Sequence, residues 1–391
     1  MSELLESRWQ ETKDALLEGL QGTRKSVMAV TLENTRKYLS ESASTGATSA
    51  GNVATLNRVI LPVIRRVMPT VIANELVGVQ PMTGPVGQIH TLRVRYSDTL
   101  SGTYGATAGE EALSPFKIAE GYSANNGSAT TAAATAALEG VAGKRLSIQI
   151  LKQTVEAKTR KLSARWTFEA AQDAQAQQGI DIEAEIMAAL AQEITAEIDQ
   201  EVLGSLATLA TSNGNNQAFD QATVSGTATF VGDEHAALAV LINRAANVIA
   251  QRTRRGAGNW AVVSPYALTI LQSATTSAFA RTTEGTFEAP TNTKFVGTLN
   301  NAMKVYVNTY AADNTAVLVG YKGSSESDAA AFYCPYIPLM SSGVVLDPAT
   351  FEPVVSFMTR YGYVELTNTA SSLGNAADYL GTVTVANSSF T

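Results

Sequence analysis

The side chains that most often carry out catalysis or bind metals are sparse in this sequence. Its 391 residues contain two histidines, His90 and His235, and one cysteine, Cys334. A triad, an acid–base pair or a zinc site built on histidine has little to draw on. His90 lies on the apolar side of a predicted strand, so we interpret it as a core residue. Cys334 is flanked by aromatic residues and Pro335 and is interpreted as a buried thiol.

Two carboxylates one helical turn apart, Glu193 and Glu197, could bind metal ions. Bundles that hold two metals in this way also require a Glu-x-x-His motif, which the sequence lacks. A phosphate-binding loop is not expected either, because residues 143–145 lack the glycine spacing of such loops. We therefore predict a protein that is not an enzyme and uses no cofactor. A metal-dependent hydrolase is kept as an alternative that a metal assay would test.

Both carboxylates belong to the longest segment with a single interpretation, residues 166–209. Apolar residues recur there at every fourth position: Ile182, Ile186, Leu190, Ile194, Ile198 and Val202. This spacing predicts a helix and excludes a strand. Gly179 separates it from a shorter helix, Asp181 can cap its start, and Glu183 and Glu185 complement the helix dipole in the first turn. A rod of roughly 40 Å would result, which several surfaces must contact.

The same region is strongly acidic. From Trp166 to Asn243 the sequence has twelve acidic residues and no Lys or Arg. Another segment or another molecule must therefore supply the counter-charge.

The overall composition limits the classes of protein that fit. An apolar content of 45 % is enough for a buried core, and the net charge of −7 argues against a general nucleic-acid binder. The N-terminus lacks the apolar core of a signal peptide, and no apolar run approaches the length of a membrane span. We expect a soluble protein of the cytoplasm with no membrane partner.

The N-terminal part has the pattern of an appendage. Residues 3–20 and 22–39 each have the apolar spacing of an amphipathic helix. Residues 40–52 form a Ser/Thr/Gly/Ala linker without core residues. Residues 1–52 are therefore predicted to be a helical pair on a tether, with a partner-binding arm favoured over a flexible tail.

A long hairpin follows. Residues 88–96 alternate, with Arg93 and Arg95 on the face opposite the apolar residues, and a returning strand is expected within residues 148–165. The connection, residues 97–146, is rich in Gly, Ala, Ser and Thr and poor in apolar residues, and a loop of this length is usually disordered or functional. A two-stranded hairpin is marginal alone in water, so we expect it to lie on another subunit.

The C-terminal half mixes helices and strands. Residues 233–255 predict a third helix, and Ser264 and Pro265 predict the cap and first turn of another. Further strands are expected at residues 260–263, 294–310, 316–322, 331–339, 359–366 and 379–385. Because there is no regular βαβ alternation, the fold class is predicted to be α+β.

Five colinear segments resemble the major capsid proteins of tailed phages, in particular the T-even-type myophage branch with the Hong Kong 97-type shell fold. They are MPTVIANELVGVQPMTGPVG (68–87), QTVEAKTRKLSARWTFEAAQDAQAQQGIDIEAEI (153–186), GTLNNAMKVYVNTYA (297–311), VGYKGSSESDAAAFYCPYIPL (319–339) and FEPVVSFMTRYGYVEL (351–366). The resemblance implies a domain map. It comprises an N-arm (53–87), an extended loop (88–165), a peripheral domain with a long spine helix (166–210 and 341–391) and an axial domain (211–340).

The resemblance also implies a function. The chain would assemble into hexamers and pentamers of an icosahedral shell that encloses packaged double-stranded DNA without sequence-specific binding. Portal, scaffold and decoration proteins would be partners, and the protein would reside in the virion capsid after assembly in the host cytoplasm. The alternative is a cellular nanocompartment shell of the same fold, which encloses a cargo enzyme.

Two sets of site residues follow. Members of the branch are cut after Leu-x-Glu, which Leu39-Ser40-Glu41 fits, so Glu41 is the candidate maturation site; cleavage and retention of the arm both stay open. Cations of the hairpin and its base are expected to meet acids of the neighbouring spine helix, since complementary charge fixes register. These interface candidates are Arg93, Arg95, Lys158, Arg160, Glu183, Glu185, Glu193 and Glu197.

Overall fold

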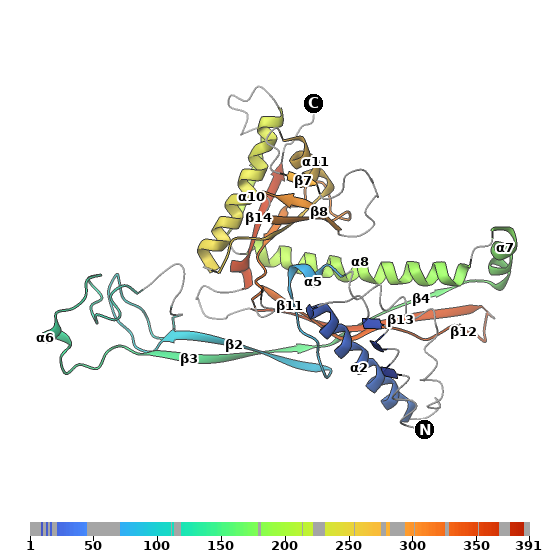
Figure 1. The fold of residues 1–391 in the computed structure, drawn as a ribbon, viewed down its shortest axis with the longest axis horizontal. Helices are drawn as coiled ribbons and strands as arrows, with labels where there is room; N and C mark the ends of the chain where they lie inside the picture. The colour runs from blue at the N-terminus through green and yellow to red at the C-terminus, as the bar shows by residue number, and fades with distance from the viewer. Residues whose placement is uncertain are drawn as a thin grey trace. The chain divides into compact units, whose positions relative to one another are not determined.

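The structure is a computed structural model and describes most of the chain in two compact units. The described residues are 9–10, 13–14, 16–17, 22–44, 71–110, 112, 119–178, 181–212, 214–221, 231–253, 255–274, 279–281, 294–300, 302–324, 328–350, 352–366 and 376–386. The first unit comprises Met1–Gly87, Thr154–Gly204 and Phe332–Val364, and the second comprises Gln88–Gln153, Ser205–Ala331 and Glu365–Thr391. Helices and strands mix without regular βαβ alternation, which confirms the α+β class (Figure 1).

The first unit combines a small sheet with long helices. The sheet has the order β1-β11-β13-β12, and β4 pairs with β13. The elements are α2 (Gly22–Ser44), α5 (Ala73–Leu76), β1 (Gly78–Val79), β4 (Lys158–Arg165), α7 (Phe168–Gln178), α8 (Ile182–Thr211), β11 (Ala331–Ser341), β12 (Val345–Leu346) and β13 (Pro353–Glu365). Along β13 the side chains alternate between buried and half-buried, as a strand with one face on a core requires.

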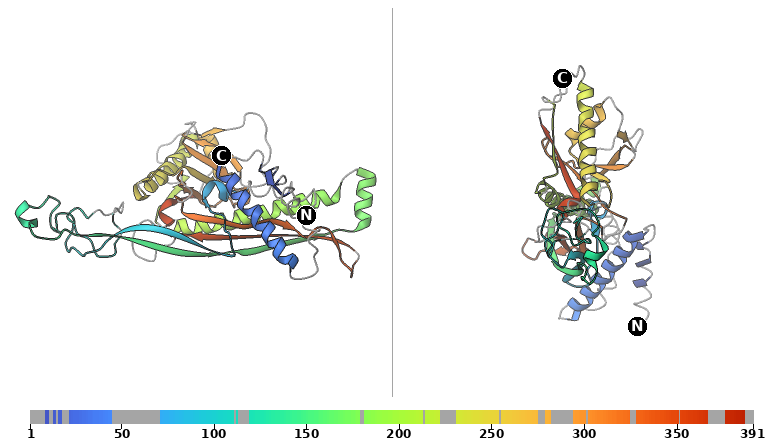
Figure 2. Two further views of the ribbon diagram at one scale, coloured as in Figure 1. Left: turned by 60° about the horizontal axis from the view of Figure 1, so that its bottom comes forward. Right: turned by 90° about the vertical axis from the view of Figure 1, so that its left-hand side faces the viewer.

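The predicted break and long helix are both present. Helix α7 ends at Gln178, and α8 begins at Ile182 and continues into the second unit. Asp181 caps α8 as predicted, since its Oδ1 accepts a hydrogen bond of 3.1 Å from the backbone N of Glu183. Of the apolar ridge, Leu190, Ile194, Ile198 and Val202 are buried. Figures 1 and 2 show this part of α8 running alongside β4 and β13.

Helix α2, in the predicted N-terminal appendage, packs against the rest of the first unit. Helix α2 buries Met28 and Leu32, and the Nδ2 of Asn34 donates hydrogen bonds to the backbone oxygens of Met82 (2.5 Å) and Tyr336 (3.0 Å). The helix extends to Ser44, so the prediction of a linker from residue 40 is wrong for its first five positions. These positions, which hold three serines, Glu41 and Ala43, continue the helix started by better-packed residues upstream. The remainder of the predicted linker lies outside the described residues.

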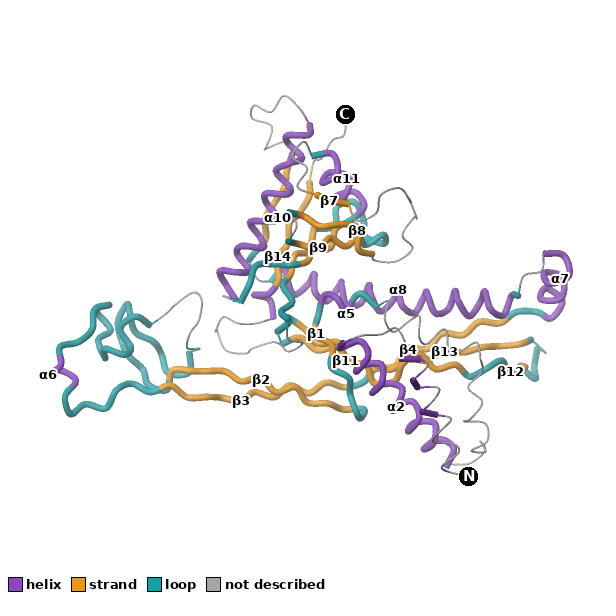
Figure 3. The backbone as a smooth tube through the Cα atoms, viewed as in Figure 1, coloured by secondary structure: helices purple, strands orange, loops and turns teal. Residues whose placement is uncertain are grey.

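The predicted hairpin is formed by β2 (Val86–Tyr96) and β3 (Leu146–Glu156), which make a two-stranded sheet with α6 (Thr135–Leu138) in its connection (Figure 3). The second strand of the hairpin differs from the single strand predicted within residues 148–165. The chain breaks at Ala157, and β4 then pairs antiparallel with β13, from Lys158 opposite Tyr361 to Arg165 opposite Val354. His90 is exposed on β2, so its interpretation as a core residue is wrong.

The hairpin connection, although poor in large apolar residues, contains a small core. Tyr96, Ala106, Ala112, Ala119 and Tyr122 are buried together, and the rings of Tyr96 and Tyr122 lie 4.5 Å apart between centroids. Two tyrosines supply most of the apolar area, and alanines pack closely around them. A count of large apolar residues underestimates such a core.

The second unit is built on a seven-stranded sheet. Its order is β5 (Asn216–Asp220), β14 (Leu380–Ala386), β10 (Val317–Gly320), β6 (Trp260–Val263), β9 (Met303–Val307), β8 (Lys294–Leu299) and β7 (Phe279–Arg281). Helices α10 (Val231–Thr253) and α11 (Pro265–Ser273) contribute to the same core, and Figure 1 shows α10 alongside β14. The predicted cap of α11 is present, because Ser264 Oγ accepts a hydrogen bond of 3.2 Å from the backbone N of Ala267.

The last strand joins this sheet rather than the unit that contains β13. Strand β14 pairs antiparallel with β10 and parallel with β5. The domain map had grouped all of residues 341–391 with residues 166–210. Alternation of Leu380, Val383 and Val385 marks a buried strand but does not say which sheet receives it.

Two kinds of feature are absent from the described residues. None of their helices combines the length and apolarity needed to cross a bilayer. No cluster of three or more His, Cys, Asp or Glu side chains among them could hold a metal ion.

Candidate functional site

The acids in the second half of α8 meet a cation of their own chain. Arg160, on β4, donates hydrogen bonds of 2.6 Å to Glu197 Oε2 and to Glu201 Oε2. Its Nε donates a third hydrogen bond of 2.6 Å to the hydroxyl of Tyr361 on β13, and that hydroxyl donates in turn to Glu201. Glu197 and Glu201 are four residues apart, so both carboxylates face the same side of the helix.

Local geometry explains why Arg160 reaches this position. In the register of β4 with β13, Arg160 lies opposite Thr359 and Tyr361 lies opposite Lys158. Arg160 and Tyr361 are therefore diagonal neighbours, which a long side chain can span. The planar guanidinium then reaches two carboxylates and one hydroxyl at once, as Arg can and Lys cannot.

The electrostatics of this cluster follow from its partly buried location. Burial opposes charge on Arg160, but the hydrogen bonds to Glu201 and Tyr361 hold the pKa of Arg160 above its ordinary value. Burial likewise opposes charge on Glu201, but Arg160 and Tyr361 keep the pKa of Glu201 below its ordinary value. The cluster is thus an ion pair that fastens the β4–β13 strand pair to α8. Of the two carboxylates that suggested metal ligands, Glu197 binds this guanidinium instead, and Glu193 is exposed on α8.

The other interface candidates are placed differently. Lys158 is exposed on β4, and Glu185 and Glu193 are exposed on α8. Arg95 is half-buried on β2, and its Nε has no hydrogen-bond partner among the described residues. The side chain of Arg93 lies outside the described residues. Within the described part of the chain, one ion pair joins two of the eight candidates, Arg160 and Glu197.

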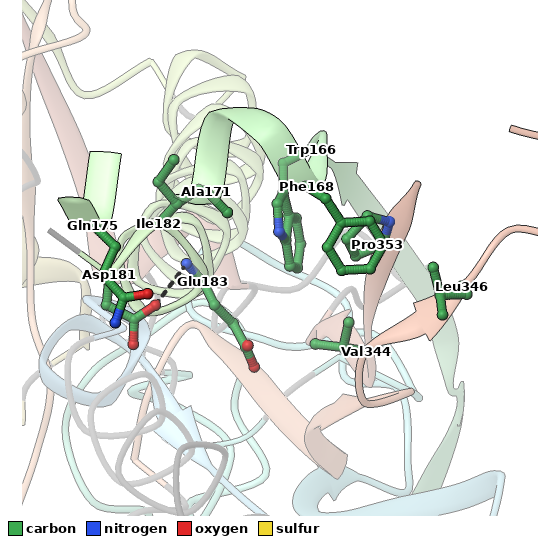
Figure 4. Close-up of a pocket in the computed structure, with 10 residues that line it drawn as sticks. All are labelled: Trp166, Phe168, Ala171, Gln175, Asp181, Ile182, Glu183, Val344, Leu346 and Pro353. Carbon is green, nitrogen blue, oxygen red and sulfur yellow. Dashed lines mark hydrogen bonds between the residues drawn. The ribbon is translucent and has the colours of Figure 1, made fainter. Parts of the chain in front are cut away.

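A pocket that the sequence did not reveal lies beside the start of α8. Its cavity of about 330 Å³ is lined by Trp166, Phe168, Ala171, Gln175, Asp181, Ile182, Glu183, Val344, Leu346 and Pro353. Figure 4 shows the rings of Trp166, Phe168 and Pro353 grouped together, with Val344 and Leu346 nearby and the hydrogen-bonded pair Asp181–Glu183 at the other side. The pocket is therefore apolar with an acidic edge. The available signal in the sequence was the pair of aromatic residues, Trp166 and Phe168, at the start of helix α7.

An apolar stripe is exposed on the hairpin. Leu146, Ile148 and Ile150 alternate along β3, so they lie on one face, and they are 53 %, 66 % and 66 % exposed. Contiguous exposed apolar residues with nearby cations are typical of a surface that contacts another protein. Lys152 continues the same alternation and is also exposed.

The candidate cleavage residue Glu41 lies within α2, three residues before its end. Its side chain lies outside the described residues. A protease that binds extended substrates would require this part of the helix to unwind.

Comparison with known proteins places the chain in a family. The model of the family described as major capsid protein Gp23 matches residues 53–387. The chain belongs to the Gp23 major capsid protein family. This match includes all five segments on which the resemblance rested, and it begins after α2.

Individual relatives agree. The major capsid protein of Vibrio phage KVP40 is 30 % identical over 416 residues, covering 84 % of this chain and 80 % of the relative. That of Enterobacteria phage T4 is 29 % identical over 412 residues, covering 83 % and 78 %. Both alignments are longer than this 391-residue chain, so each relative contains inserted residues that this capsid protein lacks.

Solved structures give more distant matches. A chain of Mycobacterium phage Cain has a TM-score of 0.48 at 13 % identity, covering 87 % of this chain and 99 % of that one. The capsid of Myoviridae phage XM1 has a TM-score of 0.45 at 12 % identity, covering 81 % and 92 %.

Family membership fixes the general function. The protein is a structural component of a phage capsid, a shell built from many copies of this chain. The relatives favour this function over a cellular nanocompartment.

Proposed function

We propose that this capsid protein forms hexamers and pentamers of an icosahedral shell with the Hong Kong 97-type fold, and that the shell encloses double-stranded DNA. Portal, scaffold and decoration proteins would be its partners during assembly in the host cytoplasm. Family membership supports the proposal. Particles purified from infected cells should contain nuclease-resistant double-stranded DNA, and a protein cargo in its place would contradict it.

We propose the domain map of the family for this chain, with one change. Residues 53–87 act as the N-arm, 88–165 as the extended loop, 166–210 and 341–366 as the peripheral domain, and 211–340 as the axial domain. Strand β14 is assigned to the axial domain because it pairs with β10 and β5.

The assembly contact is proposed to join the hairpin of one copy to the acidic start of α8 in the next. The apolar stripe of β3 would lie against the pocket formed by Trp166, Phe168 and Leu346, which is apolar as well. Arg93 and Arg95 would face Glu183, Glu185 and Glu193. The observation that carries this proposal is the coexistence of an exposed apolar stripe, continued by the exposed Lys152, and an apolar pocket beside acids.

Charge reversal tests the contact. The double variant Arg93→Glu/Arg95→Glu should fold but fail to form closed shells, because like charges would then face each other. The matched control is Arg93→Lys/Arg95→Lys, which keeps the charge and should still assemble. Electron microscopy of particles gives the readout, and normal shells from the Glu variant would refute the contact.

The N-terminal segment that precedes the N-arm, residues 1–52, is proposed to be retained in the mature particle. Its support is the packing of α2, in which Met28 and Leu32 are buried and Asn34 makes two hydrogen bonds to the first unit. Intact mass spectrometry of mature particles tests this. A chain that begins at Ser42 would show cleavage after Glu41 and would contradict retention.

A further inference from the structure

A carboxylate is buried in the first unit with few partners. Asp199 lies on α8 between the two acids bound by Arg160, and only 1 % of its surface is exposed. Its Oδ1 accepts a hydrogen bond of 2.9 Å from the backbone N of Ile72. Its Oδ2 is buried and has no hydrogen-bond partner among the described residues. An ionised carboxylate removed from water normally requires several donors, so this one is poorly solvated.

Among the described residues, the titratable groups around Asp199 do not compensate its charge. The titratable groups that share this interior are Tyr333 and Cys334 on β11, Tyr361 on β13 and Glu201 on α8, and none of these is a cation. Arg160 on β4, whose two carboxylate partners flank Asp199 in the sequence of α8, is bound to Glu197, Glu201 and Tyr361. Burial raises the pKa of Asp199 to about 7, and the Ile72 hydrogen bond opposes this only in part.

The partner of Asp199 begins a segment that is attached at two places. Ile72 precedes α5, and its N–H is held by Asp199. Farther along, the backbone N atoms of Gln80 and Met82 donate hydrogen bonds of 3.0 Å to Tyr333 and Pro335 of β11. Only the first attachment depends on a group that can gain or lose a proton near neutral pH.

Helix α5 is also bound to helix α2. Glu75 on α5 forms an ion pair with Arg24 on α2. Opening of residues 71–76 would therefore loosen one of the contacts that hold α2.

We propose that Asp199 is a proton-dependent latch, which in its neutral form holds the chain at Ile72 on helix α8 and on ionisation favours the local opening of residues 71–76. Opening exposes the carboxyl to water, where it has its ordinary low pKa. Opening then releases a proton at any pH between the pKa of the open state and that of the closed state. The equilibrium constant for opening should rise about tenfold per pH unit from about pH 4 to about pH 7, and level off above that range.

Amide hydrogen exchange of the full-length protein, read by mass spectrometry of peptides, tests the latch. After correction for the intrinsic pH dependence of exchange, protection of residues 71–77 should fall about tenfold per pH unit between about pH 5 and 7 in the wild type. In Asp199→Asn, which cannot ionise, this slope should disappear. Residues 78–82 serve as an internal control and should show no slope in either protein.

A matched control variant is Glu193→Gln, which removes an exposed carboxylate from the same helix and should keep the wild-type slope. A flat wild-type profile, or an unchanged slope in Asp199→Asn, would overturn the proposal. If Asp199→Asn does not fold, infrared spectroscopy of the wild type replaces it. The C=O stretch of a buried neutral carboxyl should persist to about pH 6 and disappear near pH 7, where the slope in protection levels off, and its absence at pH 6 would also overturn the latch.

Discussion

Both halves of helix α8 are acidic, but their carboxylates lie in different environments. In the second half, Glu197 and Glu201 bind Arg160, and Asp199 accepts a hydrogen bond from Ile72. In the first half, Glu185 and Glu193 are exposed, and Glu183 borders an apolar pocket. The second half fastens the helix to its own sheet. The first half has exposed charge and an adjacent apolar pocket, which we propose contact a neighbouring copy.

This difference corrects the simplest interpretation of the acidic segment. The absence of Lys and Arg from Trp166 to Asn243 predicted counter-charge from another segment or another molecule, and the interface hypothesis placed its source in a neighbouring subunit. Strand β4 of the same chain supplies part of it, through Arg160. A single pattern in the sequence therefore combines an internal ion pair with a surface that we propose for assembly.

The largest expected effect is on assembly from the first half of α8. Glu183→Lys/Glu185→Lys should abolish shell formation. The free energy of unfolding of the unassembled chain should fall only by the lost interaction of these carboxylates with the helix dipole, plus at most about 0.5 kcal/mol. Sedimentation velocity and chemical denaturation measure the two quantities. Shells that form normally would contradict the proposal that the first half of α8 contacts a neighbouring copy.

A stability effect is expected from the second half. Arg160→Ala leaves Glu201 and Tyr361 without their charged partner and should lower the free energy of unfolding by about 2 kcal/mol. Urea denaturation of the unassembled chain provides the measurement. Lys158→Ala, two residues away and exposed, is the control and should change it by less than about 0.5 kcal/mol. Equal effects of both variants would show that Arg160 does not fasten the helix.

A smaller effect is expected from the hydroxyl group in the same cluster. Tyr361→Phe keeps the ring and removes the hydrogen bond to Glu201, so the free energy of unfolding should fall by about 1 kcal/mol. A double-mutant cycle with Arg160→Ala should show coupling, because both residues bind Glu201. Additive effects would mean that the two contacts act independently.

The smallest effect is a change in pH dependence. Arg160 and Tyr361 hold the pKa of Glu201 below its ordinary value, against the effect of burial. The native state then binds fewer protons than the unfolded state, so this contribution is complete above the ordinary pKa of a glutamate and is lost as the pH falls through the lowered value. Acid unfolding of Glu201→Gln should therefore be less steep than that of the wild type. An identical slope would contradict the cluster.

Regular periodicity and local capping chemistry made much of the fold predictable from the sequence. The ridge at every fourth residue gave α8, Asp181 and Ser264 marked helix starts, and the alternation at residues 88–96 gave β2. Pairing between distant segments was less accessible. Residues 158–165 alternate in the same way whether they pair with β2 or with β13, and Leu380, Val383 and Val385 fit any buried strand.

The candidate site was predictable in part for the same reason. Arg160 and Glu197 were both singled out by charge, but sequence alone could not say that they belong to one molecule. The pocket beside Trp166 was missed because its walls come from segments almost 180 residues apart, at Phe168 and Leu346. The latch at Asp199 was missed because a carboxylate in an acidic helix gives no sign of burial.

The most direct test of the division of α8 is a cryo-EM reconstruction of assembled shells at side-chain resolution. It should show Arg160 bound to Glu197 and Glu201 of its own chain. It should also show the β3 stripe of a neighbouring copy seated beside Trp166, with Arg95 near Glu183 or Glu185. A hairpin that lies elsewhere, with the start of α8 facing solvent, would contradict the account.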